Sequence, residues 1–248
     1  MSQHFDNGAI SFQKAADLAS QTGWGELDFF SSGRAMDVAA RIDDKVAKGA
    51  HVLPGPSDVF KALQLTAPGR VRAVILGQDP YPTPGDAHGL AFSIAGGDRK
   101  LPQSLRTIFK SLEKDTGIAP PPHGDLTRWV QNGVLLLNTS LTVEAGKANA
   151  HRTVGWDALA TEVLAFLNAQ PSPVVFMLWG KQAQEAGKGI DQNRHCVIET
   201  AHPSPLAHGG GPEHQFIAAQ PFRQAADWLE ARGLPAIDWH LPDRPTAD

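Results

Sequence analysis

The sequence predicts a three-layer α/β/α fold around a central four-stranded parallel sheet. Four short runs are continuously apolar rather than alternating, as expected of strands that helices cover on both faces. Segments with helical periodicity separate these runs, and alternation of strands with helices is typical of parallel sheets. The expected strands are Val71–Gly77, Gly133–Asn138, Val174–Gly180 and His195–Ala201.

The expected helices lie between and around these strands. Ser104–Asp115 places Leu105, Ile108 and Leu112 on one face, which is the spacing of an amphipathic helix. Residues 1–50 are interpreted as a helical cap beside the sheet and residues 241–248 as a frayed tail, all within a single domain spanning residues 1–248. Further helices are expected at Arg34–Lys48, Trp156–Ala169, Lys181–Gly189 and Phe216–Ala231.

Composition excludes several classes of protein. The 248 residues are enough for a large buried core. With 22 Lys and Arg against 26 Asp and Glu, the net charge of −4 argues against a polybasic protein that binds by bulk charge. Cys196 is the only cysteine, so an intrachain disulfide and a cysteine-based zinc cluster are excluded. No signal peptide and no apolar run of about 18 residues is apparent, so we expect a soluble cytoplasmic protein without a membrane partner.

Polar or glycine-rich residues follow each expected strand. The carboxyl ends of parallel strands meet at one edge of a sheet, which is where open α/β sheets bind ligands. The sequence therefore predicts that five residues converge on one pocket: Asp79, Tyr81, Phe92, Asn138 and His202.

Each of these residues also has a purely structural interpretation. Asp79, in a loop stiffened by prolines, suits a carboxylate held at a fixed distance from a reacting atom, but an Asp before Pro often only caps a turn. His202, between a strand and Pro203, suits an acid, an electrophile or a metal ligand, or a histidine bonded to a loop carbonyl. Asn138 can read a ligand edge or close its strand, and Phe92 can stack on a planar ligand or fill the core.

Other chemistries have weaker support. Ser204 lacks the G-x-S-x-G context of a serine nucleophile. The spacings of His88, His151 and His208 relative to Asp79 match no zinc signature, and no phosphate-binding glycine loop is present. We therefore expect neither a metal nor a cofactor.

Four ordered motifs, RAVILGQDPY, AHGLAFS, GVLLLNTSLTV and HPSPL, closely resemble those of family-1 uracil-DNA glycosylases. The resemblance runs from about His51 to about Leu229, which is most of the chain. It implies a monomeric enzyme that starts base-excision repair by hydrolysing the N-glycosidic bond of uracil in single- and double-stranded DNA, without metal or cofactor. It also implies that the base is flipped out of the duplex.

The resemblance assigns roles to individual residues. Asp79 matches the aspartate that orients water and stabilises the cationic sugar, and His202 matches the histidine that hydrogen-bonds uracil O2. Leu206 matches the leucine that fills the space left by the base. Contacts with the base are assigned to the Gln78 backbone, the Tyr81 ring at C5, the Phe92 ring by stacking and the Asn138 amide. Further DNA contacts are expected from Pro102, Ser104, His151, Lys181 and Ser204.

The sequence departs from the family pattern at four places, one of which is the altered proline-rich phosphate loop, KLPQS at Lys100–Ser104. Pro82 replaces a common histidine after the GQDPY motif, and Lys181 replaces the serine of a Gly-Ser pair. The segment after HPSPL is shorter and richer in glycine. The departures favour altered water positioning, a steeper salt dependence and a more flexible wedge loop.

Two alternative functions remain at this point. One is a DNA-binding protein of glycosylase fold with weakened chemistry, and the other is a metal-dependent hydrolase that uses Asp79, His88 and His202. Protein partners expected from the resemblance are a proteinaceous inhibitor of uracil glycosylases and other repair proteins, which the sequence does not identify.

Overall fold

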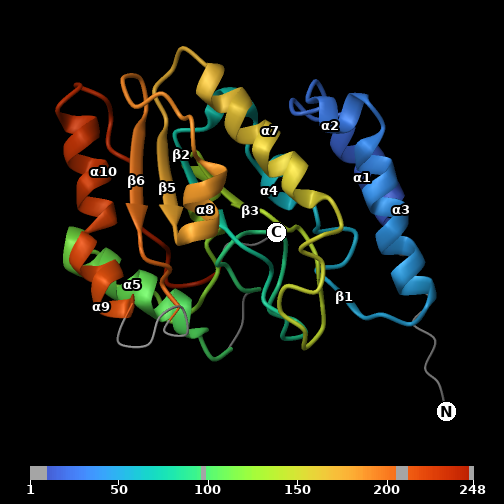
Figure 1. Cartoon of the computed structure of the whole chain (residues 1–248). Helices are drawn as coiled ribbons and strands as arrows, with labels where there is room; N and C mark the ends of the chain where they lie inside the picture. Colours follow the sequence, from blue (N-terminus) through green and yellow to red (C-terminus); the bar gives the residue numbers. More distant parts are fainter. Residues whose placement is uncertain (1–9, 96–98, 205–211, 246–248) are drawn as a thin grey trace.

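A computed structural model of the chain describes residues 10–95, 99–204 and 212–245 (Figure 1). Its central sheet is parallel and has the strand order β3-β2-β5-β6. The predicted fold class is confirmed, and each strand begins one or two residues later than expected. The strands are β2 (Ala73–Gly77), β3 (Val134–Asn138), β5 (Val175–Trp179) and β6 (Cys196–Thr200).

Most of the predicted helices are present, but the last is wrong as a single helix. It divides into α9 (Pro212–Ala219) and α10 (Pro221–Glu230). Gln220 between them has a φ of 52°, because the ring of Pro221 disfavours helical backbone at the preceding residue. The other predicted helices are α3 (Arg34–Ala47), α5 (Gln103–Thr116), α7 (Trp156–Ala169) and α8 (Lys181–Ala186).

Several further elements complete the fold. Within the segment expected as a helical cap, α1 (Phe12–Ser20) and α2 (Asp28–Ser31) precede α3. A two-stranded antiparallel ribbon joins β1 (Val52–Leu53) to β4 (Val143–Glu144), segments far apart in the sequence. The remaining elements are α4 (Lys61–Leu65), a 3₁₀ turn at Pro68–Arg70 and α6 (Thr127–Gln131).

Helices cover the sheet on both sides. Figure 1 shows α5, α9 and α10 gathered on one side, with α7 and α4 on the other and α1 to α3 beyond α7. The strands β2, β3 and β5 are buried throughout, as their continuously apolar sequences predict. Large aromatic side chains fill the space between the layers: Trp24, Trp129, Trp156, Trp179, Phe176, Phe216 and Phe222.

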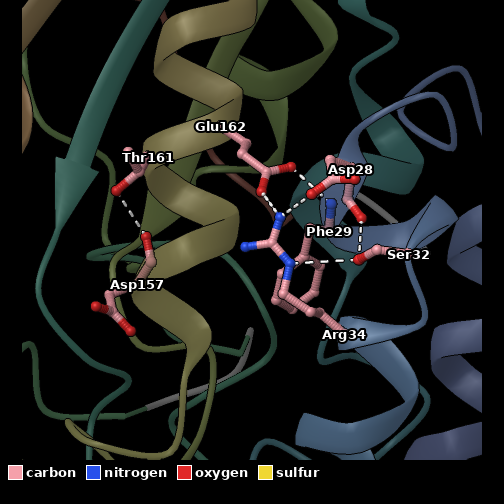
Figure 2. Close-up of polar contacts among 7 residues, drawn as sticks. All are labelled: Asp28, Phe29, Ser32, Arg34, Asp157, Thr161 and Glu162. Carbon is pink, nitrogen blue, oxygen red and sulfur yellow. Dashed lines mark hydrogen bonds and ion pairs between the residues drawn. The ribbon is translucent and has the colours of Figure 1, made fainter.

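An ionic cluster attaches the N-terminal helices to α7 (Figure 2). The Arg34 guanidinium contacts the carboxylates of both Asp28 and Glu162, the latter at 2.5 Å. The second oxygen of Glu162 accepts a hydrogen bond of 2.6 Å from the backbone N–H of Phe29. Leu27, the N-cap residue of α2, has no side-chain cap of its own. Glu162 therefore caps α2 from a helix more than a hundred residues away in the sequence.

We expect Glu162→Ala to lower the free energy of unfolding by about 1–2 kcal/mol, because it removes this cap and leaves Arg34 without one of its partners. Denaturant titration followed by circular dichroism measures the change. Glu185→Ala is the matched control, because Glu185 pairs with Lys188 on the solvent-exposed surface. The control should change the stability by less than about 0.5 kcal/mol. Equal losses in the two variants would contradict the capping role.

The C-terminal segment packs against the rest of the protein as far as Pro242, beyond the point at which the sequence predicts a frayed tail. Leu241 is buried, and the carbonyl oxygen of Pro242 lies 2.8 Å from Nε2 of His123. The expectation of a frayed tail that begins at residue 241 is therefore wrong for its first residues, because the tail closes over His123. In the described parts of the chain, none of the helices is both long enough and apolar enough to cross a membrane.

Candidate active site

The segments that follow the strands of the central sheet surround a cleft and a smaller cavity. From β2 the chain turns to β3 on one side, whereas β5 lies on the other side of β2. Ligands of open α/β sheets bind at such a switch point. The cleft has a volume of about 650 Å³ and the cavity about 160 Å³. The residues that line both are Gln78, Asp79, His202 and Ser204.

The topology correctly predicts that strand-end residues meet here. Asp79 and Tyr81 follow β2, Asn138 ends β3 and His202 follows β6, and all four line the smaller cavity. Phe92, from the loop before α5, completes the set. The local geometry of each residue indicates which chemical role it suits.

Asp79 is a partly buried carboxylate fixed by backbone donors. Its Oδ2 accepts a hydrogen bond of 2.7 Å from the backbone N–H of Asn149. Burial raises the pKa of Asp79, and hydrogen bonds from the backbone N–H groups of Asn149 and of Asp79 itself oppose the rise. The carboxylate is thus held in one orientation at the mouth of the cavity.

His202 is a neutral imidazole in a defined tautomer. Its Nδ1 accepts a hydrogen bond of 3.0 Å from the backbone N–H of Ser204, so the proton of the neutral ring lies on Nε2. Burial lowers the pKa of His202 to about 4. At neutral pH, therefore, His202 is an uncharged Nε2–H donor.

Glycine makes the close packing around His202 possible. Gly180 has a φ of 93°, and a Cβ at this position would lie 2.9 Å from Cβ of His202. The Phe92 ring lies on another side of His202, with the two ring centroids 5.7 Å apart. Phe92 has a φ of 62°, which is strained for an aromatic residue and is typical of residues held for a function.

Asn138 lies across the cavity at the end of β3. It is 7% exposed and pairs in register with Gly77 of β2. A Cβ on Gly77 would lie 2.2 Å from the Asn138 side-chain oxygen, so only glycine leaves room for this amide. The amide thereby presents one donor and one acceptor in a fixed place.

Tyr81 forms a rigid apolar wall. Its hydroxyl lies 2.8 Å from Oγ of Ser104 and donates to the carbonyl oxygen of Phe92 at 3.3 Å. Burial raises the pKa of the Tyr81 phenol, which therefore stays protonated and hydrogen-bonded. The backbone of Gln78 is fixed in turn, because its carbonyl oxygen accepts from Ser140 N at 2.8 Å and from Thr139 Oγ1 at 2.9 Å.

The residues expected to contact DNA divide into two groups. Lys181 is exposed, and both it and Ser204 line the larger cleft, while Pro102 is half-buried at the start of α5. Ser104 is buried against Tyr81, and His151 is 1% exposed with Nδ1 2.9 Å from Oγ1 of Thr142.

The DNA contacts expected of Ser104 and His151 stay predictions. The His151 ring is buried against Thr142, whereas Ser104, although buried against Tyr81, also lines the smaller cavity. Leu206 and His208 lie outside the described residues.

Sequence reasoning missed Asn149. Its loop, Ala145–Ala150, contains no motif that suggests chemistry on its own. The only signal was its position shortly after a strand that ends in the pocket. The loop also contacts Pro82, whose carbonyl oxygen accepts from the backbone N–H of Gly146 at 2.8 Å.

The suggested metal site does not assemble. Nε2 of His88 lies 2.6 Å from Oγ of Ser93, so this ring faces the core rather than Asp79 and His202. Among the described residues, no three His, Cys, Asp or Glu side chains come together as metal ligands.

A carboxylate and a neutral imidazole thus face a small cavity that also holds an aromatic ring and a fixed amide. This α/β fold and site define an enzyme that binds a planar heterocycle and cleaves a bond to it. The model of the Uracil DNA glycosylase superfamily matches residues 63–230. The chain belongs to the uracil-DNA glycosylase superfamily.

Curated relatives agree with this membership, and solved structures share the fold. The uracil-DNA glycosylase of Bacillus pumilus is 47% identical over 192 residues, covering 77% of this chain and 83% of the relative. That of Azotobacter vinelandii is 43% identical over 228 residues, covering 91% of this chain and 96% of the relative. The crystal structure of mimivirus uracil-DNA glycosylase has a TM-score of 0.78, at 22% identity and 97% coverage of both chains. A mimivirus variant in complex with UGI has a TM-score of 0.80, at 24% identity and 91% coverage of both chains.

Proposed function

We propose that Asp79 and His202 divide between them the chemistry by which this uracil-DNA glycosylase excises uracil from DNA. The reaction hydrolyses the N-glycosidic bond, releases free uracil and leaves an abasic site, which is the first step of base-excision repair. One observation carries the assignment: the carboxylate and the neutral imidazole line the same 160 Å³ cavity as the Asn138 amide.

Charge separation in the transition state explains why both groups are needed. Breaking the bond between the sugar and N1 of uracil leaves a cation-like sugar and an anionic base. A fixed carboxylate at Asp79 stabilises the cation and orients the water that adds to the sugar. The Nε2–H of His202 donates to uracil O2, where negative charge develops. A neutral donor is sufficient for this, and the backbone contact at Nδ1 supplies the required tautomer.

The pocket recognises uracil by shape and by hydrogen bonds. Phe92 stacks on the base, the Gln78 backbone contacts it, and the Asn138 amide pairs with its edge. Cytosine has a donor where uracil has an acceptor at position 4, so a fixed amide leaves an unmatched polar pair. Thymine differs from uracil by one methyl group, and the anchored ring of Tyr81 excludes it sterically.

Tyr81→Ala should release thymine from a thymine-containing strand at least about tenfold faster than the wild-type enzyme, because the wall at C5 is gone. Base release is measured by alkaline cleavage of a labelled strand. Tyr81→Phe is the matched control, since it keeps the ring and removes only the hydroxyl that contacts Ser104. The role of Tyr81 would be refuted by a Tyr81→Ala enzyme that still spares thymine completely.

The DNA strand is proposed to follow the larger cleft, where Ser204 and Lys181 lie. A base inside a duplex is out of reach and must be flipped out at a cost of a few kcal/mol. Leu206 is proposed to fill the vacated space, as apolar wedges do in other DNA-binding proteins. We also propose that the enzyme acts as a monomer, and that this chain binds a protein inhibitor of the UGI kind, as the mimivirus variant does.

The direct test is an assay of the wild-type protein with chelator present. A labelled single-stranded oligonucleotide with one uracil is incubated in EDTA and then treated with alkali, beside a matched thymine strand. We expect cleavage at uracil alone, which would establish the reaction, its metal independence and its selectivity together. Tight DNA binding without cleavage would instead favour a binding protein, and activity lost only in EDTA would favour the metal-dependent alternative.

A further inference from the structure

The loop Ala145–Ala150, which we name the latch loop, is bonded at three points to the segment that carries Asp79. The backbone N–H of Asn149 donates to Oδ2 of Asp79 at 2.7 Å. The Asn149 side-chain oxygen accepts from Nε2 of Gln78. Gly146 N donates to the Pro82 carbonyl at 2.8 Å. The three contacts bracket Asp79 from both sides along the chain.

The direction of the Asn149 N–H depends on an unusual backbone conformation. Asn149 has a φ of 64°, in the left-handed region that asparagine tolerates better than other residues with a side chain. The latch loop itself is exposed on the surface, from Gly146 to Ala150. Its first residue is anchored, because Ala145 N donates to the His51 carbonyl at 2.8 Å, next to the β1–β4 ribbon.

We propose that Asn149 is a positioning residue for Asp79, which acts through the N–H of its left-handed backbone. The inference rests on the proposed role of Asp79. The bond from Asn149 to Oδ2 fixes how the carboxylate is turned toward the cavity that it lines. The contact also favours the charged carboxylate, which burial disfavours.

Two substitutions separate the backbone contribution from that of the side chain. Asn149→Val strongly disfavours the left-handed conformation and turns the N–H away from Asp79. Asn149→Gly keeps this conformation and the N–H, and removes only the bond to Gln78. Asn193→Val is the control, because Asn193 is exposed in a turn after α8, away from the residues that line the cleft.

We expect Asn149→Val to lower kcat about tenfold to a hundredfold, with KM little changed, because it removes a hydrogen bond to a charged, functional carboxylate. Asn149→Gly should stay within about threefold of the wild type, since hydrogen bonds between neutral groups contribute less. Steady-state rates on a uracil-containing oligonucleotide give kcat and KM for each variant, and single-turnover rates give the chemical step. Thermal melts confirm that each variant is folded.

The pH profile distinguishes positioning from a merely structural role. Loss of the Asn149 N–H should move the acid limb of kcat to higher pH in Asn149→Val and leave it in place in Asn149→Gly. The charged or titratable groups around Asp79 are His202 after β6, Lys181 at the start of α8, and Lys147, which pairs with Glu144 at 2.6 Å. These groups are the same in both variants, so the shift reports Asp79.

Two results would overturn the inference. One is an Asn149→Val enzyme with wild-type kcat, and the other is a lower kcat with an acid limb that has not moved. Failure of the proposed function would look different: the wild-type protein would not release uracil, or Asp79→Asn would be fully active.

Discussion

Asp79→Asn should lower the rate of uracil release by roughly 10²–10³-fold while the protein stays folded, because an amide cannot neutralise the developing cationic sugar. The amide fills the same space and can still accept the bond that Asn149 N–H donates to Oδ2 at 2.7 Å. The comparison therefore isolates the charge from the geometry. Single-turnover kinetics on a single-stranded uracil substrate measure the chemical step directly.

Asp86→Asn is the matched control for this prediction. Asp86 lies in the same loop, seven residues further along, and pairs with Arg99 at 3.1 Å rather than lining the cavity. If only the negative charge of the region mattered, both variants would lose activity alike. We expect Asp86→Asn to stay within a few-fold of the wild type. Near-wild-type turnover by Asp79→Asn would remove Asp79 from the mechanism.

The pH dependence of the same reaction has a definite sign. Asp79 works as the carboxylate, and burial raises its pKa above the ordinary value of about 3.9. The rate should therefore fall as the pH is lowered through this raised pKa. The pH–rate profile should show no change in slope near 6.5, the ordinary pKa of an imidazole, because burial lowers the pKa of His202 to about 4.

His202→Ala should lower the rate by roughly 10²–10³-fold, because the Nε2–H donor to uracil O2 is lost. Binding of the substrate should weaken far less, since the anionic charge on O2 appears only as the bond breaks. Measurement of kcat and KM separately tests this split. His240→Ala is the control, because His240 is exposed near the C-terminus and outside the cavity.

The protonation state of His202 is open to direct observation. Nitrogen NMR of labelled histidine should show the neutral Nε2–H tautomer from about pH 5.5 upward, given the pKa of about 4. The backbone bond from Ser204 to Nδ1 predicts that tautomer independently. A His202 that titrates near pH 6.5, or a fully active His202→Ala enzyme, would contradict the role of a neutral donor.

Much of this molecule was predictable from local sequence alone. Continuous burial on both faces leaves a signature within each strand, and amphipathic spacing leaves one within each long helix, as at Trp156–Ala169. Parallel strands bring their carboxyl ends to one edge, so Asp79 and His202 could be placed at the same pocket although 122 residues of chain separate them. The break at Gln220 also has a local signal, because Pro221 disfavours helical backbone at the residue before it.

Only the tertiary structure decided which side chains face the cleft and what holds them there. Ser104 and His151 carry polar groups suited to DNA, and the fold buries both of them, with Tyr81 and Thr142 as their partners. Asn149 meets Asp79 across 70 residues, and Glu162 caps α2 across 133 residues. Contacts of this kind depend on the path of the loops between the layers. The hydrophobic periodicity of a single segment carries no information about that path. The strand patterns and the residues at their ends therefore follow from the sequence itself, whereas the orientation of the Asp79 carboxylate depends on a contact that forms only in the assembled fold.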